Sequence, residues 1–264
     1  MSLRSRRTGP LLEIESDRVC GGDLRKDEVL DVGDGFRRRF LRERRVGQPV
    51  STRFRHENFD VTDDRTRWNE KYSGDDDFEL PVDPIPELER RIDTLPAGRA
   101  LDVATGTGRN AIYLAEHGYD VEAVDVSDEA LKQAKHRADE RGVDVEWIRA
   151  DLTDTEFDVE TDTYDLITVS FFAALDLLPD LKEALAPGGV LVYEHHLRSS
   201  DAVEIGPSSK RHRYRSNDLL RACLDLTILS YEERRRTVNG GSAAVTTLVA
   251  RNSDGGTQSY PDLP

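Results

Sequence analysis

The stretch "LDVATGTGRN", residues 101–110, decides the fold class of this chain. Its apolar start, Leu101–Val103, is typical of a buried strand, and Gly106 and Gly108 follow two residues apart. The next segment, "RNAIYLAEHG" (109–118), has apolar residues at helical spacing and ends on glycine. A strand, a glycine turn and a helix in this order bring backbone N–H groups and a helix N-terminus close to a ligand. The stretch therefore predicts a cofactor-binding turn in an α/β fold.

Strands and helices alternate after this turn. Helix-like segments fill the intervals between apolar strands, which predicts parallel strands joined by crossover helices. The pattern then changes, because two strand-like segments are separated only by "TVNGG", a hairpin signal. We predict an α/β fold with a doubly wound, mostly parallel seven-stranded sheet and an antiparallel C-terminal hairpin. The predicted strands are 99–104, 120–126, 145–151, 164–172, 190–196, 226–235 and 242–252, and the predicted helices include 109–118, 127–141 and 176–186.

Composition limits the partners of the chain. Its 264 residues carry a net charge of −15, from 37 basic and 52 acidic side chains. An acidic surface repels phosphate backbones, so a nucleic-acid partner is disfavoured. The basic residues are mostly arginine, which together with the acidity is typical of a halophilic protein. The longest apolar run, 166–175, is far shorter than the ~20 residues of a membrane span. Cys20 and Cys223 provide no disulfide framework or metal-ligand spacing. We expect a cytoplasmic protein with neither a membrane partner nor a metal.

Residues 1–60 differ from the rest, with 14 basic and 11 acidic side chains and hence a net charge of 14 − 11 = +3. One interpretation is a basic arm that binds RNA or a protein partner. The other is a disordered leader or a non-native extension. The second is favoured because "VTDDRTRWNEKY" (61–72) reads like a natural beginning. The predicted organisation is this leader, an N-terminal helical lid at 61–98, a main domain at 99–252 and a loose tail at 253–264.

The glycine turn alone fits two cofactors, NAD and S-adenosylmethionine. Its spacing, Gly-x-Gly-x-x-Ala, suits the first, and Asp125 at the end of the second strand can bind the ribose of either. Asp102, inside the first strand, favours the second. A carboxylate there can orient the amides of the turn and meet an α-ammonium group, but would repel a pyrophosphate. Asp151 ends the third strand, where it can accept a hydrogen bond from an adenine amino group. The "PGG" (187–189) that precedes the fifth strand leads to a hairpin rather than to a second mononucleotide-binding half. S-adenosylmethionine is therefore favoured.

The ordered motifs of residues 66–252 resemble those of class I S-adenosylmethionine-dependent methyltransferases. They read "LDVATGTGRNA", "VDVS", "RADL" and "ALAPGGVLVYE". Within that superfamily the chain resembles the tellurite-resistance/thiopurine methyltransferase-like group, through "RWNEKY" (67–72), "GTGRN" (106–110) and "GPSSKRHRYRSNDLLRACLDLTILSYEE" (206–233). The resemblance implies methyl transfer as the activity and S-adenosylmethionine as the cofactor. Motifs and resemblance together predict these cofactor-binding residues: Trp68, Tyr72, Asp102, Ala104, Thr105, Gly106, Gly108, Arg109, Asn110, Asp125, Val126, Asp151, Leu152 and Ser170.

One position departs from the family pattern. The family usually has glycine where this chain has Ala104, and often cysteine where it has Thr105. Alanine lacks the tolerance of glycine for a positive φ angle. We expect Ala104 to stay extended, in which case the turn forms and binds the cofactor.

Two further features allow more than one interpretation. Trp68 and Tyr72 lie four residues apart on a predicted short helix, so they share one face. This helix could close over the cofactor as a lid, as the resemblance implies, or pack as a staple at the start of the domain. The basic stretch "SKRHRYR" (209–215) could attract an anionic acceptor, but a solvated loop is favoured.

The predicted reaction needs alignment more than acid–base chemistry. Methyl transfer is an in-line displacement, and a base is required only where the acceptor must lose a proton. In this fold the carboxyl ends of the fourth and fifth strands border the transferred methyl group. The catalytic candidates are Glu194, His195 and His196; strand alternation places Glu194 and His196 on one face and His195 on the other.

The predicted acceptor is a small molecule with a thiol, an oxyanion or another soft nucleophile. Two other functions remain as alternatives: a non-catalytic cofactor-binding protein and an NAD-dependent oxidoreductase. The second is disfavoured because the sequence contains no Tyr-x-x-x-Lys.

Overall fold

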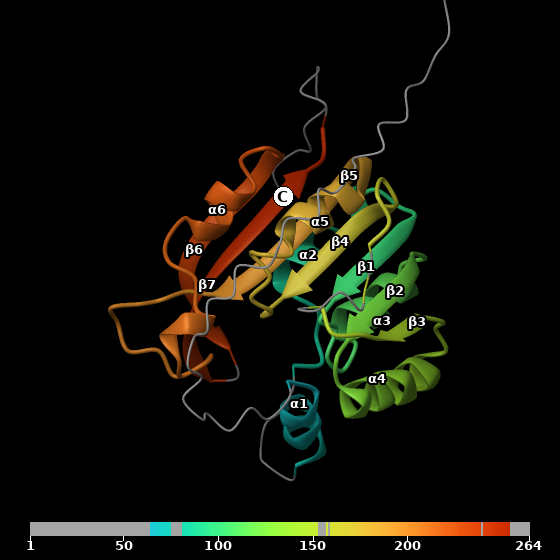
Figure 1. Ribbon diagram of the computed structural model, residues 1–264, viewed down its shortest axis with the longest axis horizontal. Coiled ribbons are helices and arrows are strands. Elements are labelled where there is room, and N and C mark those ends of the chain that lie inside the picture. Colours follow the sequence, from blue (N-terminus) through green and yellow to red (C-terminus); the bar gives the residue numbers. More distant parts are fainter. Residues whose placement is uncertain (1–63, 75–80, 153–156, 158, 239, 254–264) are drawn as a thin grey trace, which may run out of the picture. The chain divides into compact units, whose positions relative to one another are not determined.

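Seven strands form one sheet in the order β3-β2-β1-β4-β5-β7-β6, as the computed structural model shows (Figure 1). β1 to β5 run parallel, and β7 runs antiparallel to both β5 and β6. The predicted α/β class, the mostly parallel sheet and the C-terminal hairpin are confirmed. The strands are β1 (Arg99–Val103), β2 (Asp120–Asp125), β3 (Glu146–Arg149), β4 (Tyr164–Ser170), β5 (Leu185–His196), β6 (Thr227–Val238) and β7 (Gly241–Arg251).

The structure describes residues 64–74, 81–152, 157, 159–238 and 240–253. The predicted leader, 1–60, and all of the predicted tail except Ser253 lie outside these residues, as does Cys20. All of the described residues belong to one compact unit, His56–Pro264. None of the helices within the described ranges is long and apolar enough to cross a membrane.

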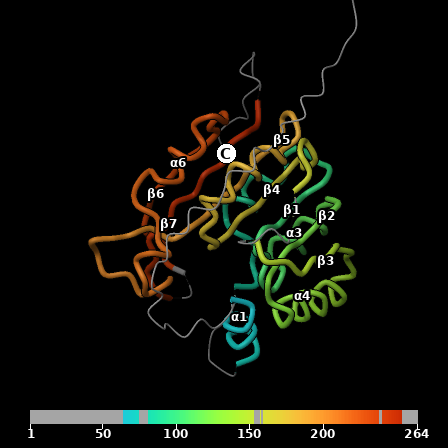
Figure 2. Tube along the Cα trace, viewed as in Figure 1, coloured from blue at the N-terminus to red at the C-terminus, as the bar shows by residue number. Residues whose placement is uncertain are grey.

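Helix ends follow local sequence signals. In α4, the Ser127 hydroxyl accepts a hydrogen bond from the Ala130 N–H (3.1 Å) at the start, and Gly142 adopts φ 67° at the end. Figure 2 traces the chain through these elements. The helices are α1 (Asp64–Ser73), α2 (Pro86–Arg91), α3 (Arg109–Glu116), α4 (Asp128–Arg141), α5 (Leu178–Ala184) and α6 (Asp218–Ala222), with short 3₁₀ turns at Ile92–Thr94 and Lys210–His212.

Each face of the sheet has its own apolar core. On one face, called the α3 face here, Leu166 and Val192 pack with Leu114 of α3. On the other, called the α5 face, Ile167 and Leu191 pack with residues of α5 and α6. Because side chains alternate along a strand, the even-numbered residues of β4 from Leu166 and of β5 from Val190 belong to the α3 face, and the odd-numbered ones to the α5 face. This rule determines which polar side chains meet at the carboxyl ends of the strands.

The "PGG" segment (187–189) does not precede the fifth strand, as was predicted, but lies within it. β5 already begins at Leu185, and the segment is an irregularity inside it, where the register with β4 shifts between Tyr164 and Leu166. Gly189 lies so close to its neighbours that a Cβ atom there would be 2.7 Å from the Tyr164 carbonyl oxygen. The glycines therefore allow a bulge in the strand rather than end it.

Candidate functional site

The glycine turn between β1 and α3 is held by the end of β2. One Asp125 oxygen accepts a hydrogen bond from the Gly106 N–H (2.7 Å), and the other accepts one from the Ser127 N–H (2.9 Å). The Thr105 N–H donates to the Val124 carbonyl (2.9 Å). Gly106 and Gly108 adopt φ angles of 57° and 79°. The turn is thus fixed from both sides, and burial raises the pKa of the Asp125 carboxyl.

Asp102 lies below the turn and is fully buried. Its carboxylate accepts hydrogen bonds from the hydroxyls of Thr105 (2.5 Å) and Thr168 (2.7 Å) and from the Asn110 amide (3.4 Å). Burial raises its pKa, and these three hydrogen bonds act in the opposite direction. The prediction that Asp102 orients the amides of the turn needs correction, because it holds the Thr105 side chain, whereas Asp125 binds the Gly106 amide. The reason is its position inside β1, one residue before the chain leaves the sheet at Val103.

Ala104 is not extended, so the prediction for this position was wrong. Its φ angle is 53°, in the left-handed region where alanine costs about 1–2 kcal/mol. The next residue, Thr105, has its N–H bonded to β2 and its hydroxyl bonded to Asp102. The chain must turn sharply at Ala104 to make both contacts. The turn therefore forms at a cost in backbone strain that glycine would avoid.

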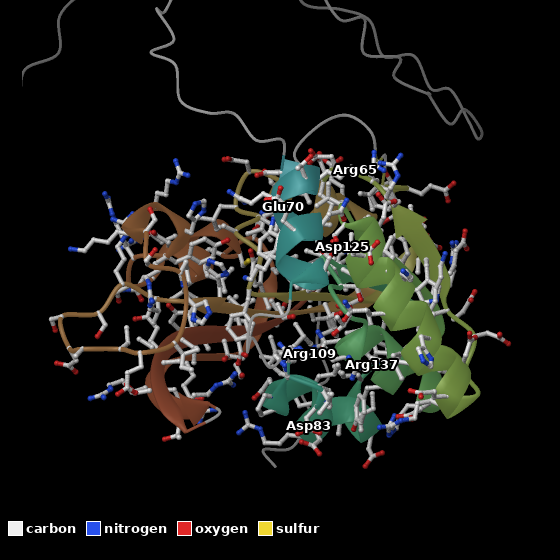
Figure 3. All side chains as sticks on the ribbon, turned by 90° about the horizontal axis from the view of Figure 1, so that it is seen from below. Arg65, Glu70, Asp83, Arg109, Asp125 and Arg137 are labelled. Carbon is white, nitrogen blue, oxygen red and sulfur yellow. The ribbon has the colours of Figure 1, made fainter. Side chains whose placement is uncertain are left out.

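Helix α1 docks on the N-terminal end of α4 mainly through polar contacts. The Asn69 side-chain oxygen accepts hydrogen bonds from the Ser127 hydroxyl (2.8 Å) and the Glu129 N–H (3.3 Å), and Arg65 pairs with Asp128 (2.5 Å). The helix has no fully buried residue. In Figure 3, Asp125 lies next to this helix. α1 is therefore attached to the body of the fold by hydrogen bonds and a surface ion pair rather than by an apolar core.

Tyr72 brings α1 to the glycine turn. Its hydroxyl oxygen lies 2.9 Å from the position that a Cβ atom on Gly106 would take. Trp68 and Tyr72 share one face, as predicted, with ring centroids 5.9 Å apart. Burial, followed by the Asp125 charge, raises the pKa of Tyr72. This contact agrees with both interpretations of the helix, lid and staple, and the lid stays a prediction.

The start of α3 connects the turn to β4. The Asn110 amide donates to the Ser170 hydroxyl (3.2 Å), and its side-chain oxygen accepts from the Ile85 N–H (3.1 Å). Asn110 lies within the helix, and Gly108 occupies the N-cap position. The Arg109 guanidinium lies 5.5 Å from the centre of the Phe171 ring, and burial lowers its pKa. Three of the predicted cofactor-binding residues, Arg109, Asn110 and Ser170, therefore lie at one place, where α3 begins and β4 ends.

The remaining predicted cofactor-binding residues follow β2 and β3. Val126 comes directly after β2, and Asp151 and Leu152 come two and three residues after the end of β3. The Ala150 N–H donates to the Asp125 carbonyl (3.1 Å), which keeps the segments that follow β2 and β3 close together. Leu152 packs against the α5-face core. The structure thus brings these three residues to the carboxyl edge of the sheet, beside Asp125.

Glu194 is committed to an ion pair, which speaks against its predicted catalytic role. Its two oxygens accept hydrogen bonds from the Arg236 guanidinium, each at 2.7 Å, and the Thr247 hydroxyl adds a third at 3.3 Å. The Glu194 side chain is only 1% exposed. Both carboxylate oxygens are thus directed at the hairpin, through Arg236 and Thr247, rather than at an acceptor. The sequence could not show this, because Arg236 comes from the hairpin, 42 residues further on.

The two histidines occupy opposite faces, as alternation predicts. On the α5 face, the His195 ring packs against Tyr214 (4.2 Å between centroids, planes inclined by 43°), and its Nε2 lies 3.1 Å from the His212 carbonyl. On the α3 face, the His196 ring stacks on Phe171 (4.4 Å). Both Nδ1 atoms are buried without a hydrogen-bond partner in the part of the chain that the structure describes. The two rings therefore belong to different clusters, although they are neighbours in sequence.

Burial keeps both histidines neutral. It lowers the pKa of His195 to about 4 and that of His196 to about 3. The Arg213 charge lowers both pKa values further, and the charge of Arg236 also lowers that of His196. A ring that resists protonation to this degree is a weak general base near pH 7.

The basic stretch 209–215 is an ordered loop. Arg213 donates to the carbonyls of Pro207 (2.7 Å), Leu197 (3.2 Å) and Ile205 (3.3 Å). This agrees with the favoured interpretation of a loop, in which backbone carbonyls hold the arginine. Gly206 packs against His196, since a Cβ atom there would lie 2.8 Å from the His196 Nδ1. The segment just before this loop therefore covers part of the α3-face histidine.

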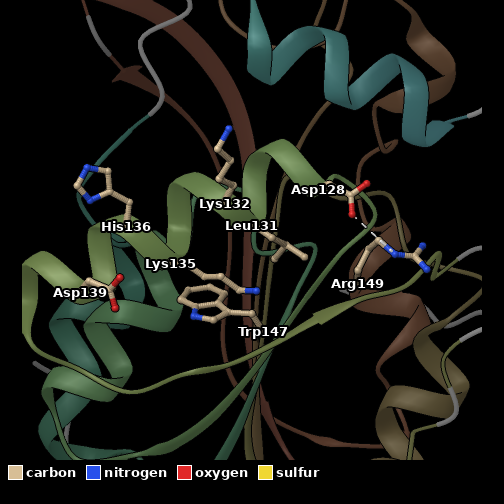
Figure 4. Close-up of a pocket in the computed structure, with 8 residues that line it drawn as sticks. All are labelled: Asp128, Leu131, Lys132, Lys135, His136, Asp139, Trp147 and Arg149. Carbon is tan, nitrogen blue, oxygen red and sulfur yellow. Dashed lines mark ion pairs between the residues drawn. The ribbon is translucent and has the colours of Figure 1, made fainter.

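A separate hollow of about 440 Å³ lies between α4 and the edge strand β3 (Figure 4). It contains none of the predicted cofactor-binding residues. Asp128 and Arg149 border it and lie 3.8 Å apart. The Trp147 ring, which lines it, also packs against the turn, because a Cβ atom on Gly108 would lie 2.7 Å from this ring. Gly108 is thus needed for close packing as well as for its φ angle.

Sequence comparison supports one family. Residues 100–189 match the family model described as "Methyltransferase domain". The chain is similar to the demethylmenaquinone methyltransferase of Clavibacter sepedonicus, with 36% identity over 110 residues, 39% of this chain and 43% of that protein. It is also similar to the tRNA 5-carboxymethoxyuridine methyltransferase of Escherichia coli, with 32% identity over 140 residues, 46% of this chain and 52% of that protein. The chain therefore spans about half the length of these curated relatives.

Solved structures agree on the fold. The crystal structure of TehB from Haemophilus influenzae superposes with a TM-score of 0.56 at 18% identity, covering 70% of this chain and 67% of that one. An S-adenosylmethionine-dependent methyltransferase from Mesorhizobium loti gives a TM-score of 0.50 at 20% identity, covering 65% and 100%. Residues 100–189 thus match a methyltransferase domain, and the sheet that contains them has the fold of S-adenosylmethionine-dependent methyltransferases. At these identities the structures establish the fold alone, so the assignment to the tellurite-resistance/thiopurine group stays a prediction.

The residues at the turn of this methyltransferase domain fit S-adenosylmethionine. Because Gly106 has no Cβ atom, the space next to the Tyr72 hydroxyl stays open. Asp125 lies at the end of β2, where a ribose would be bound, and Asp102 supports the turn below. The methyltransferase match favours S-adenosylmethionine over the alternative cofactor NAD.

Proposed function

We propose that the chain transfers a methyl group from S-adenosylmethionine to a small anionic acceptor with a soft nucleophilic atom, such as a thiolate or an oxyanion. The observation that carries this proposal is the arginine-rich environment at the carboxyl ends of β4 and β5. The charge of the buried Glu194 acts on Arg109, and Arg236 forms an ion pair with Glu194. Arg213 and Arg236 both act on the neutral His196. Cations around a largely buried site favour an anionic ligand.

The residues of the turn would hold the cofactor. Asp125 suits the ribose hydroxyls, Asp151 the adenine amino group, and the start of α3, with Arg109 and Asn110, the methionine part. Bound there, S-adenosylmethionine would supply a methyl group on a sulfonium sulfur, which leaves as a thioether with both electrons of the broken C–S bond. The acceptor contributes the electron pair for the new bond. The chain itself aligns the acceptor and excludes water, which in ideal intramolecular cases is worth up to ~7–11 kcal/mol.

A proton-abstracting base is not required by this proposal. Glu194 is occupied by Arg236, and both histidines are neutral with strongly lowered pKa values. An acceptor that is already an anion brings its own lone pair and releases no proton. The arginines would stabilise that anion on binding and position it by directed N–H donors. The neutral histidines then help to shape the pocket without adding a competing charge.

The direct test is transfer of radiolabel from methyl-tritiated S-adenosylmethionine. The acceptors are selenite, 2-mercaptobenzoate, thiophenol as an aromatic thiol without the carboxylate, and bulk tRNA. The proposal expects label in selenite or 2-mercaptobenzoate and a lower kcat/KM for thiophenol at equal thiolate concentration. Label in tRNA alone, or tight S-adenosylhomocysteine binding with no transfer to any acceptor, would overturn it. The second result would favour the alternative of a non-catalytic cofactor-binding protein.

The names of the relatives give other acceptors to compare. They mention demethylmenaquinone and a tRNA uridine, and neither is assigned to this chain. The net charge of −15 disfavours tRNA, because an acidic surface repels a phosphate backbone. The proposed location is the cytoplasm, and adaptation to high salt is proposed from the same charge and the excess of arginine over lysine.

A further inference from the structure

Phe171, directly after β4, has a backbone conformation that bulky residues rarely adopt. Its φ angle is 57°, in the left-handed region. Glycine, asparagine and aspartate account for most such residues, because a large side chain is disfavoured there. A strained residue at the edge of a site calls for an account of what the strain achieves.

The left-handed turn moves the Phe171 ring from one face of the sheet to the other. Ser170 pairs with Glu194 in the register of β4 and β5, so both belong to the α3 face. Regular alternation would place residue 171 on the opposite face, with His195. Instead, the Phe171 ring stacks on His196, with centroids 4.4 Å apart and planes inclined by 24°. The backbone strain thus brings the ring to the face that carries the cofactor turn.

Several contacts hold this turn in place. The Phe171 N–H donates to the Glu194 carbonyl (2.8 Å), so the pairing with β5 continues through the turn. The Tyr193 hydroxyl donates to the Phe172 carbonyl (2.6 Å). The Ala174 N–H lies within hydrogen-bond distance of the Tyr193 hydroxyl (2.9 Å) and the Tyr214 hydroxyl (3.0 Å). The conformation is therefore fixed by a buried network on the α5 face and not by the ring itself.

The Ser170-Phe171 dipeptide connects the two halves of the site. Ser170 accepts a hydrogen bond from Asn110, at the start of α3. Phe171 contacts the Arg109 guanidinium (5.5 Å from the ring centre) and the His196 ring. One backbone step thus links the start of α3, where Arg109 and Asn110 would hold the methionine part of the cofactor, to His196 at the acceptor end.

The geometry points to Phe171 as a positioning residue for the methyl acceptor. Its ring keeps Arg109 and His196 at a fixed separation, and so sets the direction from which an anionic acceptor approaches the transferred methyl group. The inference rests on the proposed function. Cation–π and aromatic contacts of this kind are worth enough to change acceptor affinity about tenfold when the ring is lost.

The test compares Phe171→Leu, Phe171→Gly and the conservative Phe171→Tyr. Asp162→Gly is the matched control, because Asp162 is also left-handed (φ 54°) but exposed and outside the site. Three quantities are measured: the S-adenosylhomocysteine Kd by calorimetry, KM and kcat for 2-mercaptobenzoate, and the pKa of His196 by NMR. For Phe171→Leu and Phe171→Gly we expect a Kd within twofold of the wild type, a KM raised about tenfold and a His196 pKa that rises towards its ordinary value. Phe171→Tyr and Asp162→Gly should match the wild type in all three.

The inference is overturned if Phe171→Leu leaves both the KM and the His196 pKa unchanged, or if it weakens S-adenosylhomocysteine as much as the acceptor. Failure of the proposed function has a different signature, because the wild type itself would then transfer no label to selenite or 2-mercaptobenzoate. The His196 pKa still tests the positioning role in that case, since an unchanged value in Phe171→Leu rejects it. A melting temperature for Phe171→Gly at or above that of Phe171→Leu would show that the strain is borne by the backbone.

Discussion

The cofactor turn and the acceptor end of this sheet are built from different parts of the chain. In the turn, Asp102 and Asp125 bind hydroxyls and amides that lie mostly within a short stretch of sequence. At the acceptor end, Phe171, His196 and Arg236 meet from three distant segments, and Arg236 is itself 42 residues from its partner Glu194. The first region can be predicted from the spacing of residues in the sequence, whereas the second depends on which strands become neighbours in the sheet. Each substitution below is chosen to affect one region and leave the other in place.

The largest effect is expected in the cofactor turn. Asp125→Ala leaves the N–H groups of Gly106 and Ser127 without their acceptor, and Gly106→Val adds a branched side chain at φ 57° against Tyr72. Both should weaken S-adenosylhomocysteine binding at least 100-fold in calorimetry while circular dichroism shows a folded protein. The control is Asp120→Ala, at the opposite, exposed end of the same strand, which should bind like the wild type. Retained affinity in both turn variants would remove the site assignment.

The next effect concerns the stability of the acceptor end. Arg236→Met leaves the buried Glu194 carboxylate without its partner, which costs about 3–5 kcal/mol. Urea denaturation should show this loss, and adding Glu194→Gln should recover most of it, because the unpaired charge is then gone. Equal stability of the wild type and Arg236→Met would mean that the pair does not form in solution.

The histidines predict a pH dependence that belongs to the acceptor end. Their pKa values in the folded state, about 4 for His195 and about 3 for His196, lie below the ordinary 6.5, so the unfolded chain binds more protons below pH 6.5. Stability should therefore fall as the pH drops from about 6.5 towards 4, by about 2 kcal/mol for each histidine at pH 5. Burial raises the pKa values of Asp102 and Asp125, which acts in the opposite sense.

The contribution of the histidines to this pH dependence is isolated by comparing the wild type with a variant that lacks both rings. The double variant His195→Gln/His196→Gln lacks both imidazoles and keeps the carboxylates, so its denaturation midpoint should depend less steeply on pH between 6.5 and 5. The same slope in the wild type and the double variant would contradict the buried, neutral state of these rings.

The smallest effect is expected again in the cofactor turn, on the stability of the fold. Ala104→Gly removes the strain of alanine at φ 53° and should stabilise the fold by about 1 kcal/mol in urea denaturation. Ala111→Gly is the opposite control, because Ala111 is helical and buried in α3, where glycine is destabilising. If both substitutions destabilise the protein equally, Ala104 is not left-handed in solution.

The sequence predicted the turn well because its signals are local. The strand, the two glycines and the helix that follow one another in 99–116 are each recognised from adjacent residue types, and the cap of α4 pairs Ser127 with Ala130, three residues further on. Ala104 was the exception, since its φ angle is set by the hydrogen bond of Thr105 to the neighbouring strand β2. That bond depends on sheet pairing, which the residue types at 104 and 105 do not encode.

At the acceptor end the sequence identified the right strand but not the contacts. Alternation placed His195 and His196 on opposite faces correctly, but a regular strand does not account for the Phe171 ring, which shares the face of His196 because of its left-handed backbone. Glu194 suggested a base only while its partner in the hairpin was unknown. The run of arginines in β6, "RRR" at 234–236, was the available signal for that partner, and only the sheet order gives it meaning.

The central claim, that the acceptor arrives as an anion at a site without a base, is tested most directly by the pH dependence of kcat/KM. The acceptor is 2-mercaptobenzoate, and the range is pH 5 to 9. The account predicts a rate that follows the ionisation of the thiol and then stays level, with the same apparent pKa in the wild type and in His196→Gln. A second inflection between pH 6 and 8 that disappears in His196→Gln would contradict it.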